Sequence, residues 1–259
     1  MKRYWVQGAD TRMKPDFTTC LLIDAGIGNG MRVMDAGCGS GDVSFLLCDL
    51  VGKEGEVVGV DHDASAIAIA RQRTAAHDQP SVNFLQCELQ ALPDSIGTFD
   101  AIVGRRVLMY QKDPVATVRA LSKYLRPNGI ALFQEHDTTM VPASLAPFSL
   151  HKKAQTWLQE MIAREGADLH IGFNLHGIFT RAGLAVENVR AECLVQTPDT
   201  PYALGHIVRA CLPRIVALGV ASASEVDIET LQERLDQERS ACSGVYIGDV
   251  MFGSWARKV

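Results

Sequence analysis

The stretch Val33–Asp42 reads V-M-D-A-G-C-G-S-G-D, and the segment V-V-G-V-D that ends at Asp61 follows it. An apolar run leads into a glycine-rich turn, a helical pattern follows, and a second short apolar run ends on an acid. In α/β proteins this arrangement builds a nucleoside pocket, because glycines let a ligand approach the backbone and the acid accepts hydrogen bonds from ribose hydroxyls. The stretch therefore predicts an α/β fold that binds a nucleoside.

The spacing of the glycines distinguishes two classes of cofactor. A dinucleotide fingerprint requires G-x-G-x-x-G. Counted from Gly37 and Gly39, the third glycine position is Asp42, and counted from Gly39 and Gly41 it is Ser44. Neither frame matches, which argues against a nicotinamide-dependent oxidoreductase of Rossmann type. The chain also lacks a Tyr-x-x-x-Lys pair, although an acid at the end of the second strand suits both kinds of cofactor.

The composition is that of an ordinary globular chain. The 259 residues are 47% hydrophobic and 21% charged, with a net charge of −5, which argues against nucleic acid or an anionic membrane as the main partner. The seven cysteines include no C-x-x-C pair, which favours reduced thiols over disulfides or a zinc site. No run approaches the ~18 apolar residues of a membrane span. We expect a cytoplasmic protein with no metal site and no membrane insertion.

Short apolar runs alternate with helical patterns through the first half of the chain, as βαβ units require. Strands are expected at 31–36, 56–60, 82–86, 99–103 and 130–134, and helices at 43–51, 64–77 and 114–125. The second half departs from this alternation. It has helical patterns at 150–164 and 175–182, a strand at 184–195, a long and mostly helical segment at 198–243, and a last strand at 245–255.

One frame through the turn does match a known motif. The pattern D-x-G-x-G-x-G, formed by Asp35, Gly37, Gly39 and Gly41, resembles motif I of the class I S-adenosylmethionine (SAM)-dependent methyltransferases. Three segments further along the chain resemble later motifs of the same family: F-L-Q-C-E-L-Q-A-L-P at 84–93, T-F-D-A-I-V-G-R-R-V-L-M-Y-Q-K-D at 98–113, and L-R-P-N-G at 125–129. The resemblance covers about the first half of the chain.

The resemblance implies a fold and a division of the chain. The expected architecture is α/β, a seven-stranded Rossmann-like methyltransferase sheet with helices on both faces and a helical cap, in which the last two strands are antiparallel. We expect a single domain over residues 1–259, with its core at about 30–138 and 183–259 and cap segments at about 139–182 and 198–243. The helical insertion between the last two strands is expected to cover the substrate side.

The resemblance also implies the cofactor and its contacts. SAM would bind, and S-adenosylhomocysteine (SAH) would leave, at a site formed by the turn glycines, with Asp35 ordering the turn or meeting the amino acid tail. Asp61 would bind the ribose and His62 would lie against the adenine. Glu88 would accept from the adenine amino group, and the backbone N–H of Leu89 would meet a ring nitrogen. Arg105 would face the cofactor through its backbone carbonyl, because a guanidinium beside a sulfonium is unfavourable.

Candidates for a general base follow the fifth predicted strand, where Glu135, His136 and Asp137 reach the ligand edge of the sheet. A histidine can exchange a proton near neutral pH, so His136 is the catalytic candidate. His151, His170 and His206 fall in the predicted cap segments and are further candidates for contact with the acceptor.

The predicted reaction is methyl transfer from SAM to O, N or C of a small organic molecule. The match is closest to the group that includes quinone and secondary-metabolite enzymes. Two alternatives remain: the nicotinamide-dependent oxidoreductase, and a SAM-binding protein without catalysis. The atom that is methylated, the acceptor and the oligomeric state, a homodimer included, stay open.

Overall fold

The computed structural model describes residues 16–77, 82–137, 139, 144–200 and 202–259. The predicted domain boundary at residue 1 and part of the first cap segment lie outside these residues. In chain order, the elements are α1 (Phe17–Asp24), β1 (Arg32–Ala36), α2 (Asp42–Val51), β2 (Glu56–Asp61), α3 (Ala64–His77), β3 (Val82–Gln86), η1 (Asp94–Ile96), β4 (Phe99–Arg105), η2 (Leu108–Tyr110), α4 (Pro114–Ser122), β5 (Leu125–Asp137), α5 (Ser149–Arg164), α6 (Ile171–Ala182), β6 (Leu184–Gln196), α7 (Leu204–Ala217), α8 (Ala223–Val226), α9 (Ile228–Ala241) and β7 (Tyr246–Lys258).

Seven strands form one mixed sheet in the order β3-β2-β1-β4-β5-β7-β6. The strands β1 to β5 are parallel to one another, and β7 runs antiparallel to both β5 and β6. The order reverses between β1 and β4, which is the switch point where open α/β sheets bind ligands at the carboxyl ends of their strands. The expected fold class is therefore confirmed, including the antiparallel last pair.

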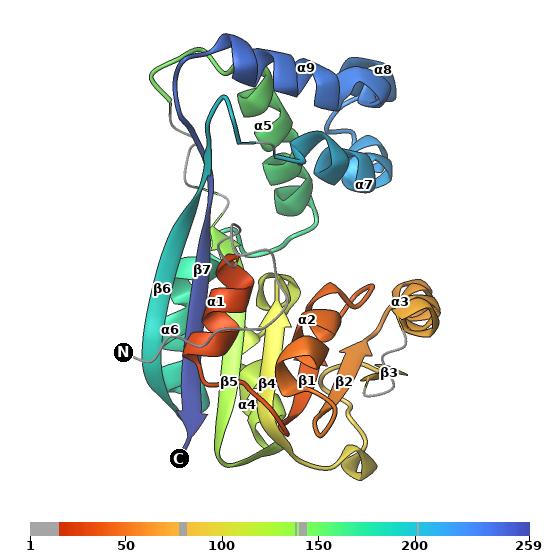
Figure 1. Ribbon diagram of the computed structural model, residues 1–259, viewed down its shortest axis with the longest axis vertical. Helices are drawn as coiled ribbons and strands as arrows, with labels where there is room; N and C mark the ends of the chain where they lie inside the picture. Colours follow the sequence, from red (N-terminus) through yellow and green to blue (C-terminus); the bar gives the residue numbers. More distant parts are fainter. Residues whose placement is uncertain (1–15, 78–81, 138, 140–143, 201) are drawn as a thin grey trace.

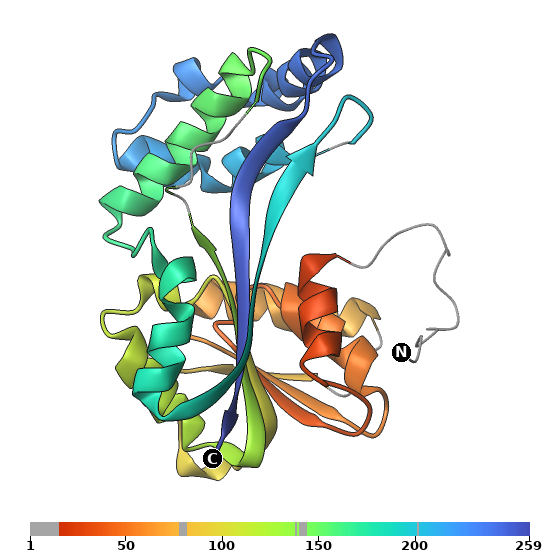
Figure 2. The same ribbon diagram turned by 90° about the vertical axis from the view of Figure 1, so that its left-hand side faces the viewer.

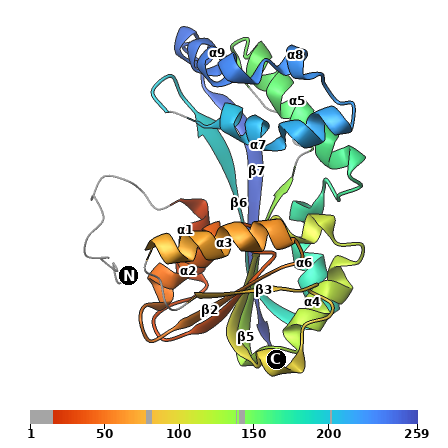
Figure 3. The ribbon, with the colours of Figure 1, turned by 90° about the vertical axis from the view of Figure 1, so that its right-hand side faces the viewer.

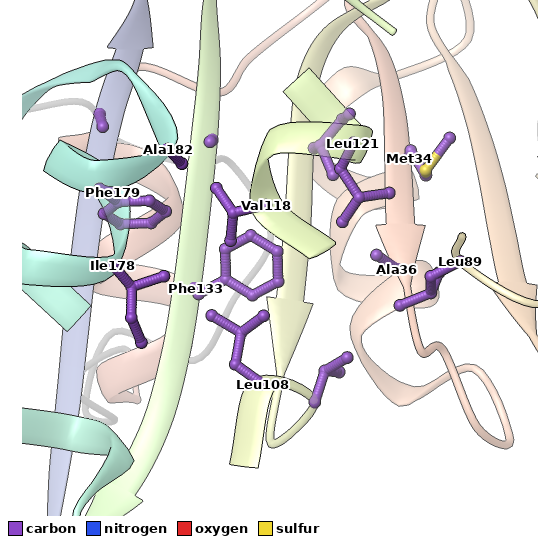
Figure 4. Packing of buried hydrophobic residues seen from close by; sticks show 14 of the residues in the cluster. Met34, Ala36, Leu89, Leu108, Val118, Leu121, Phe133, Ile178, Phe179 and Ala182 are labelled. Carbon is purple, nitrogen blue, oxygen red and sulfur yellow. The ribbon is translucent and has the colours of Figure 1, made fainter. Parts of the chain in front are cut away.

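Helices cover both faces of the sheet, and each face has its own apolar core. Figure 3 shows α1, α2 and α3 on one side and α4 and α6 on the other. The cluster under the first three helices includes Leu21 and Leu47. The cluster under α4 and α6 includes Val118, Phe133 and Phe179, which lie together in Figure 4. The central strands are therefore packed on both faces.

The helices α5, α7, α8 and α9 form a cap beyond the carboxyl ends of the parallel strands (Figure 1). They share a third apolar cluster, which includes Trp157, Val208 and Leu231. The long strands β6 and β7 run from the sheet up to this cap, as Figure 2 shows. The cap is thus built from α5, before β6, and from the α7–α9 segment between β6 and β7.

One part of the predicted cap belongs to the core instead. The expected cap segment 139–182 includes α6, but the apolar stripe of α6, with Ile171, Leu175 and Phe179, packs in the cluster on the sheet face that α4 also covers. The rings of Phe133 on β5 and Phe179 lie 6.0 Å apart between centroids. The assignment of residues 171–182 to the cap was wrong, because an apolar stripe fits the sheet as well as it fits other helices.

Candidate functional site

The glycine turn joins β1 to α2 in a backbone conformation that few other residues adopt. Gly37, Gly39 and Gly41 have φ angles of +71°, +52° and +92°, in the left-handed region that favours glycine. The N–H of Gly37 donates to the carbonyl of Val60 over 2.7 Å, which ties the turn to β2. Gly41 is the residue that caps the start of α2. The spacing of the three glycines is therefore explained by the path of the backbone.

Asp61 fixes the same turn from the end of β2. One of its carboxylate oxygens accepts from the N–H of Gly39 over 2.8 Å, and the other accepts from the N–H of Asp63 over 2.9 Å. The side chain is largely buried and lines a small cavity beside the turn. A carboxylate has about four lone-pair sites, so two backbone donors leave it able to accept from a ligand's hydroxyl groups.

This smaller cavity, of about 160 Å³, brings five of the predicted cofactor residues together: Gly37, Asp61, His62, Glu88 and Leu89. Leu89 is buried, whereas His62 and Glu88 are exposed at its rim. The ring Nδ1 of His62 lies 3.3 Å from Asp61 Oδ1. The cavity thus gathers residues from the ends of β1, β2 and β3, as a nucleoside site at this switch point requires.

A larger cavity, of about 510 Å³, opens on the other side of the turn. Its walls include Asp35, Gly37, Gly39, Arg105 and His136 from the core, and Gln155, Tyr202 and Leu204 from the cap side. The cavity therefore lies between the sheet and the cap. Gly41 lines neither cavity; a Cβ there would lie 3.0 Å from the ring of Phe84.

Both signs of charge occur at the turn end of the larger cavity. Asp35 is buried and accepts from Ser44 Oγ over 2.6 Å, and burial raises its pKa to about 6. A guanidinium nitrogen of Arg105 lies 4.0 Å from Asp42 Oδ2, and burial, with the neighbouring charge of Arg106, lowers the pKa of Arg105. Asp35 contacts α2 through Ser44, while the N–H of Gly39 in the turn is held by Asp61.

His136 lies in the wall of the larger cavity near the cap. Its Nδ1 is 3.8 Å from Asp249 Oδ2, and the other oxygen of Asp249 accepts from Gln155 Nε2 over 3.0 Å. About a fifth of the His136 side chain is exposed. Three elements, β5, β7 and α5, thus bring an imidazole, a carboxylate and an amide into one row on the cavity wall.

The two acids beside His136 have a different environment. Side chains alternate along a strand, so Glu135 and Asp137 point away from His136, and both are fully buried. Glu135 Oε1 accepts from the N–H groups of Val107 and Leu108 over 2.9 and 2.8 Å. Burial raises the pKa of Glu135 to about 7. Neither acid lines a cavity, so His136 alone of the three candidates faces the site.

The predicted cap histidines do not line the cavity either. His151 is buried and pairs with Glu238 over 2.7 Å, inside the cap. His170 lies 3.6 Å from Asp137 Oδ2 outside the cap, and His206 is exposed. Sequence position alone did not show which way these rings point.

The larger cavity also has lining residues that were not among the predicted site residues, including Arg106, Gln155, Tyr202 and Asp249. Burial raises the pKa of Tyr202 to about 12, so its hydroxyl stays protonated. The antiparallel register pairs His136 with Met251, and Asp249 lies two residues before Met251 on the same face of β7. Only knowledge of that register would have identified Asp249 from the sequence.

In the described part of the chain, no group of three or more His, Cys, Asp and Glu side chains is arranged to hold a metal ion. Among the described helices, none combines the length and the apolar character needed to span a bilayer.

Residues 27–183 match the model of a family described as a methyltransferase domain. Among curated proteins, a demethylmenaquinone methyltransferase of Lactococcus lactis is 27% identical over 136 residues, which is 52% of this chain and 54% of that protein. A ubiquinone/menaquinone biosynthesis C-methyltransferase of Cellvibrio japonicus is 33% identical over 112 residues, covering 43% and 45%. The matches span about half the length of these curated relatives.

Solved structures share the fold over nearly the whole chain. A SAM-dependent methyltransferase from Aquifex aeolicus superimposes with a TM-score of 0.55 at 16% identity, covering 94% of this chain and 90% of that one. A phosphoethanolamine N-methyltransferase 2 of Haemonchus contortus, in complex with phosphomonomethylethanolamine and SAH, has a TM-score of 0.58 at 17% identity and covers 93% and 52%. At these identities the likeness concerns the fold.

Proposed function

Because the chain belongs to the methyltransferase-domain family, we propose that it transfers a methyl group from SAM to O, N or C of a small organic acceptor. One observation carries the proposal: the glycine turn separates a small cavity that ends at Asp61 from a larger one closed by the cap. The first is suited to a nucleoside, the second to an acceptor, and the two meet at Gly37, Arg106 and Tyr110. The net charge of −5 supports an acceptor other than nucleic acid.

The residues around the turn fit SAM. A Cβ on Gly39 would meet no protein atom within 4 Å, so the space beside this glycine is open to a ligand. In the proposal Asp61 accepts from the ribose hydroxyls, Glu88 and the Leu89 N–H hold the adenine, and His62 lies at the rim. The start of α2 favours a carboxylate. SAM supplies an activated methyl group on a sulfonium.

The amino acid tail of SAM carries an ammonium and a carboxylate. Asp35 and Arg105 offer the opposite charges at the turn end of the larger cavity. We therefore assign the ammonium to Asp35 and the carboxylate to the Arg105 side chain together with the first N–H groups of α2. This differs from the expectation that Arg105 contributes only its backbone carbonyl; the support is that its guanidinium lies 4.0 Å from Asp42, which also lines the cavity.

The protein's main task in this reaction is alignment, which supplies roughly 7–11 kcal/mol when reacting groups are well oriented. An acceptor hydroxyl or acidic C–H must also lose a proton. His136 is the proposed base, and Asp249 would stabilise the imidazolium that forms, as a carboxylate does in other His–Asp pairs. Gln155 holds Asp249 in place over 3.0 Å.

The lining of the larger cavity supports a quinone-like acceptor. Apolar side chains from the cap side, among them Leu158, Ile162 and Ile207, face the polar row of His136 and Asp249. An apolar cavity with a few convergent polar groups suits a lipophilic ring with a hydroxyl group. The names of the curated relatives, which concern menaquinone and ubiquinone biosynthesis, agree with this class.

Ligand-dependent melting tests the cofactor. We expect SAM and SAH to raise the melting temperature, since a ligand that binds only the folded state stabilises it, and NAD to leave it unchanged. A shift with NAD alone would favour the oxidoreductase. A shift with SAH but no methylated product, by mass spectrometry with naphthohydroquinones and catechols, would favour a SAM-binding protein without catalysis.

Two substitutions of Asp61 separate its roles. Asp61→Ala removes the acceptor of the Gly39 N–H, which lies 2.8 Å away, as well as the proposed ribose contact. Asp61→Asn keeps one carbonyl oxygen. We expect calorimetry to detect no SAH binding to Asp61→Ala and binding weakened at least ~10-fold in Asp61→Asn, about the value of one charged hydrogen bond. Unchanged affinity in both variants would place the ribose elsewhere.

A further inference from the structure

Arg106 occupies the point where the two cavities meet. It follows β4 directly and lines both the smaller cavity beside Asp61 and the larger one beneath the cap. Arg106 is exposed. Any cofactor and acceptor that fill the two cavities would therefore meet next to this guanidinium.

The backbone of Arg106 is held in an unfavourable conformation. Its φ of +57° lies in the left-handed region, where a non-glycine residue outside a special site is uncommon. The N–H of Arg106 donates to the Gln134 carbonyl over 2.8 Å, and the buried Glu135 holds the next two N–H groups. The side chain of Val107 also packs against Gly37. The turn is thus built to keep Arg106 in this position.

The other arginines of the larger cavity have acidic partners, whereas Arg106 has none among the described residues. Arg105 lies 4.0 Å from Asp42, and Arg214 forms a two-pronged pair with Glu165. Within the described residues, no carboxylate lies within ion-pair distance of the Arg106 guanidinium. Its charge acts on Tyr202 and Cys211 across the cavity, where it opposes the effect of burial on their pKa values.

A cation without a carboxylate at ion-pair distance is unfavourable beside the sulfonium that the proposed function brings there, because like charges repel. A negative charge on the acceptor would remove the conflict. Guanidinium groups bind carboxylates and other oxyanions through a planar fork of donors. An anionic group on the acceptor would therefore supply the negative charge that balances Arg106.

We propose that Arg106 is the anion-binding residue of the acceptor site, and that the acceptor carries an oxyanion, either a carboxylate or an ionised phenol or enol oxygen, close to the methylated atom. This rests on the proposed function and narrows its substrate class from small organic molecules to organic acids and acidic phenols. Such an oxyanion would lie between the Arg106 guanidinium and the cap wall at Tyr202.

The test uses the full chain saturated with SAH and two probes of equal shape, 4-hydroxybenzoate and its neutral amide, 4-hydroxybenzamide. We expect calorimetry to show the benzoate binding at least ~10-fold more tightly than the amide, as one charge-assisted contact provides. Arg106→Gln should abolish this preference without changing amide binding. Arg106→Lys should keep part of it, since the charge remains. Arg209→Gln, which breaks a surface pair with Glu229 outside the cavity, should keep all of it.

A second pair of ligands separates acceptor binding from cofactor binding. SAH carries the tail carboxylate, and methylthioadenosine lacks the whole amino acid tail. Arg106→Gln should bind both as the wild type does, whereas Arg105→Gln should lose affinity for SAH and keep it for methylthioadenosine. Arg106→Asn serves as a second neutral variant, because asparagine adopts left-handed backbone more readily than other residues, so loss of folding in the glutamine variant would not prevent the measurement.

Several results would overturn the proposal. Equal binding of benzoate and amide to the wild type would show that the site does not select an anion, and a preference that survives in Arg106→Gln would assign it to another residue. If Arg106→Gln weakens SAH but not methylthioadenosine, the guanidinium binds the cofactor tail instead. Failure of the wild type to bind SAH would reject the methyltransferase function itself, a result distinct from the other three.

Discussion

At the scale of single residues, Glu135 connects the protein's stability to the shape of its site. Its carboxyl group is fully buried and holds the Val107 and Leu108 N–H groups through Oε1. The other oxygen, Oε2, is buried and has no hydrogen-bond partner among the described residues. Ionising such a group is costly, which explains why burial raises its pKa from 4.5 to about 7.

This raised pKa predicts a pH dependence of stability. The folded protein binds a proton at Glu135 more tightly than the unfolded chain, so the contribution to stability is complete below pH 4.5 and is lost as the pH rises through about 7. Relative to Glu135→Gln, the wild type should lose up to about 3 kcal/mol in its free energy of unfolding across this window. Urea unfolding of both proteins at several pH values measures the difference. A constant difference contradicts the assignment.

Two glycines of the turn should respond differently to alanine. A Cβ on Gly37 would lie 2.5 Å from Val107 Cγ2, whereas one on Gly39 would meet no protein atom within 4 Å. Gly37→Ala should therefore lower the free energy of unfolding by about 1–3 kcal/mol through strain and overpacking. Gly39→Ala should cost about 1 kcal/mol but block SAH binding, because its methyl group enters the cavity. Urea unfolding measures the loss of stability in the two variants, and calorimetry measures their affinity for SAH. If Gly39→Ala binds SAH as tightly as the wild type does, the proposed position of the cofactor beside Gly39 is contradicted.

The residues that sequence reasoning identified are those whose role depends on local geometry. The spacing of the turn glycines reflects their positive φ angles, and the position of Asp61 reflects the end of one strand. Asp249 lies near His136 because β7 pairs with β5, although the two residues are over a hundred positions apart in the chain. Gln155 reaches Asp249 from α5, through the packing of that helix. No local pattern encodes such contacts.

At the scale of elements, strand and helix positions followed from apolar periodicity, but their packing partners did not. The helix α6 was predicted with the correct end at Ala182 but with a start at Leu175, four residues after the observed start, and it was assigned to the wrong layer. The strand β5 begins at Leu125, five residues before the predicted start, because L-R-P-N-G already pairs with β4 at Leu125. Periodicity shows which face of an element is buried; it does not show what buries it.

The position of α6 on the sheet makes a prediction about stability. Phe179 is fully buried against Phe133, whereas Phe173 on the same helix is 59% exposed. Phe179→Ala should lower the free energy of unfolding by about 3–5 kcal/mol, and Phe173→Ala by about 1 kcal/mol or less. Urea unfolding followed by circular dichroism measures both. Equal small losses would mean that α6 contributes no more to the sheet core than a surface helix does.

At the scale of the whole molecule, the buried apolar side chains form three separate clusters. Two of them enclose the sheet and the third lies inside the cap. The cap meets the core through the long strands β6 and β7, through the Gln155–Asp249 hydrogen bond, and through the cavity walls. A site between two separately packed parts can admit an acceptor when one of them moves.

This arrangement predicts that the cap opens as a unit at lower free energy than the sheet. Leu231→Ala creates a void in the cap, where Leu231 is fully buried, at a cost of about 2–5 kcal/mol. We expect amide hydrogen exchange to accelerate about 30- to 5,000-fold across α5, α7 and α9, in proportion to that cost, and to stay unchanged in β1 and β4. Ile102→Ala, in the sheet core, should instead accelerate exchange throughout, because the cap depends on the sheet for its anchoring strands.

SAH together with an acceptor should slow cap exchange in the wild type. Equal acceleration of sheet and cap by Leu231→Ala would show one cooperative unit, and acceptor entry would then require a different opening.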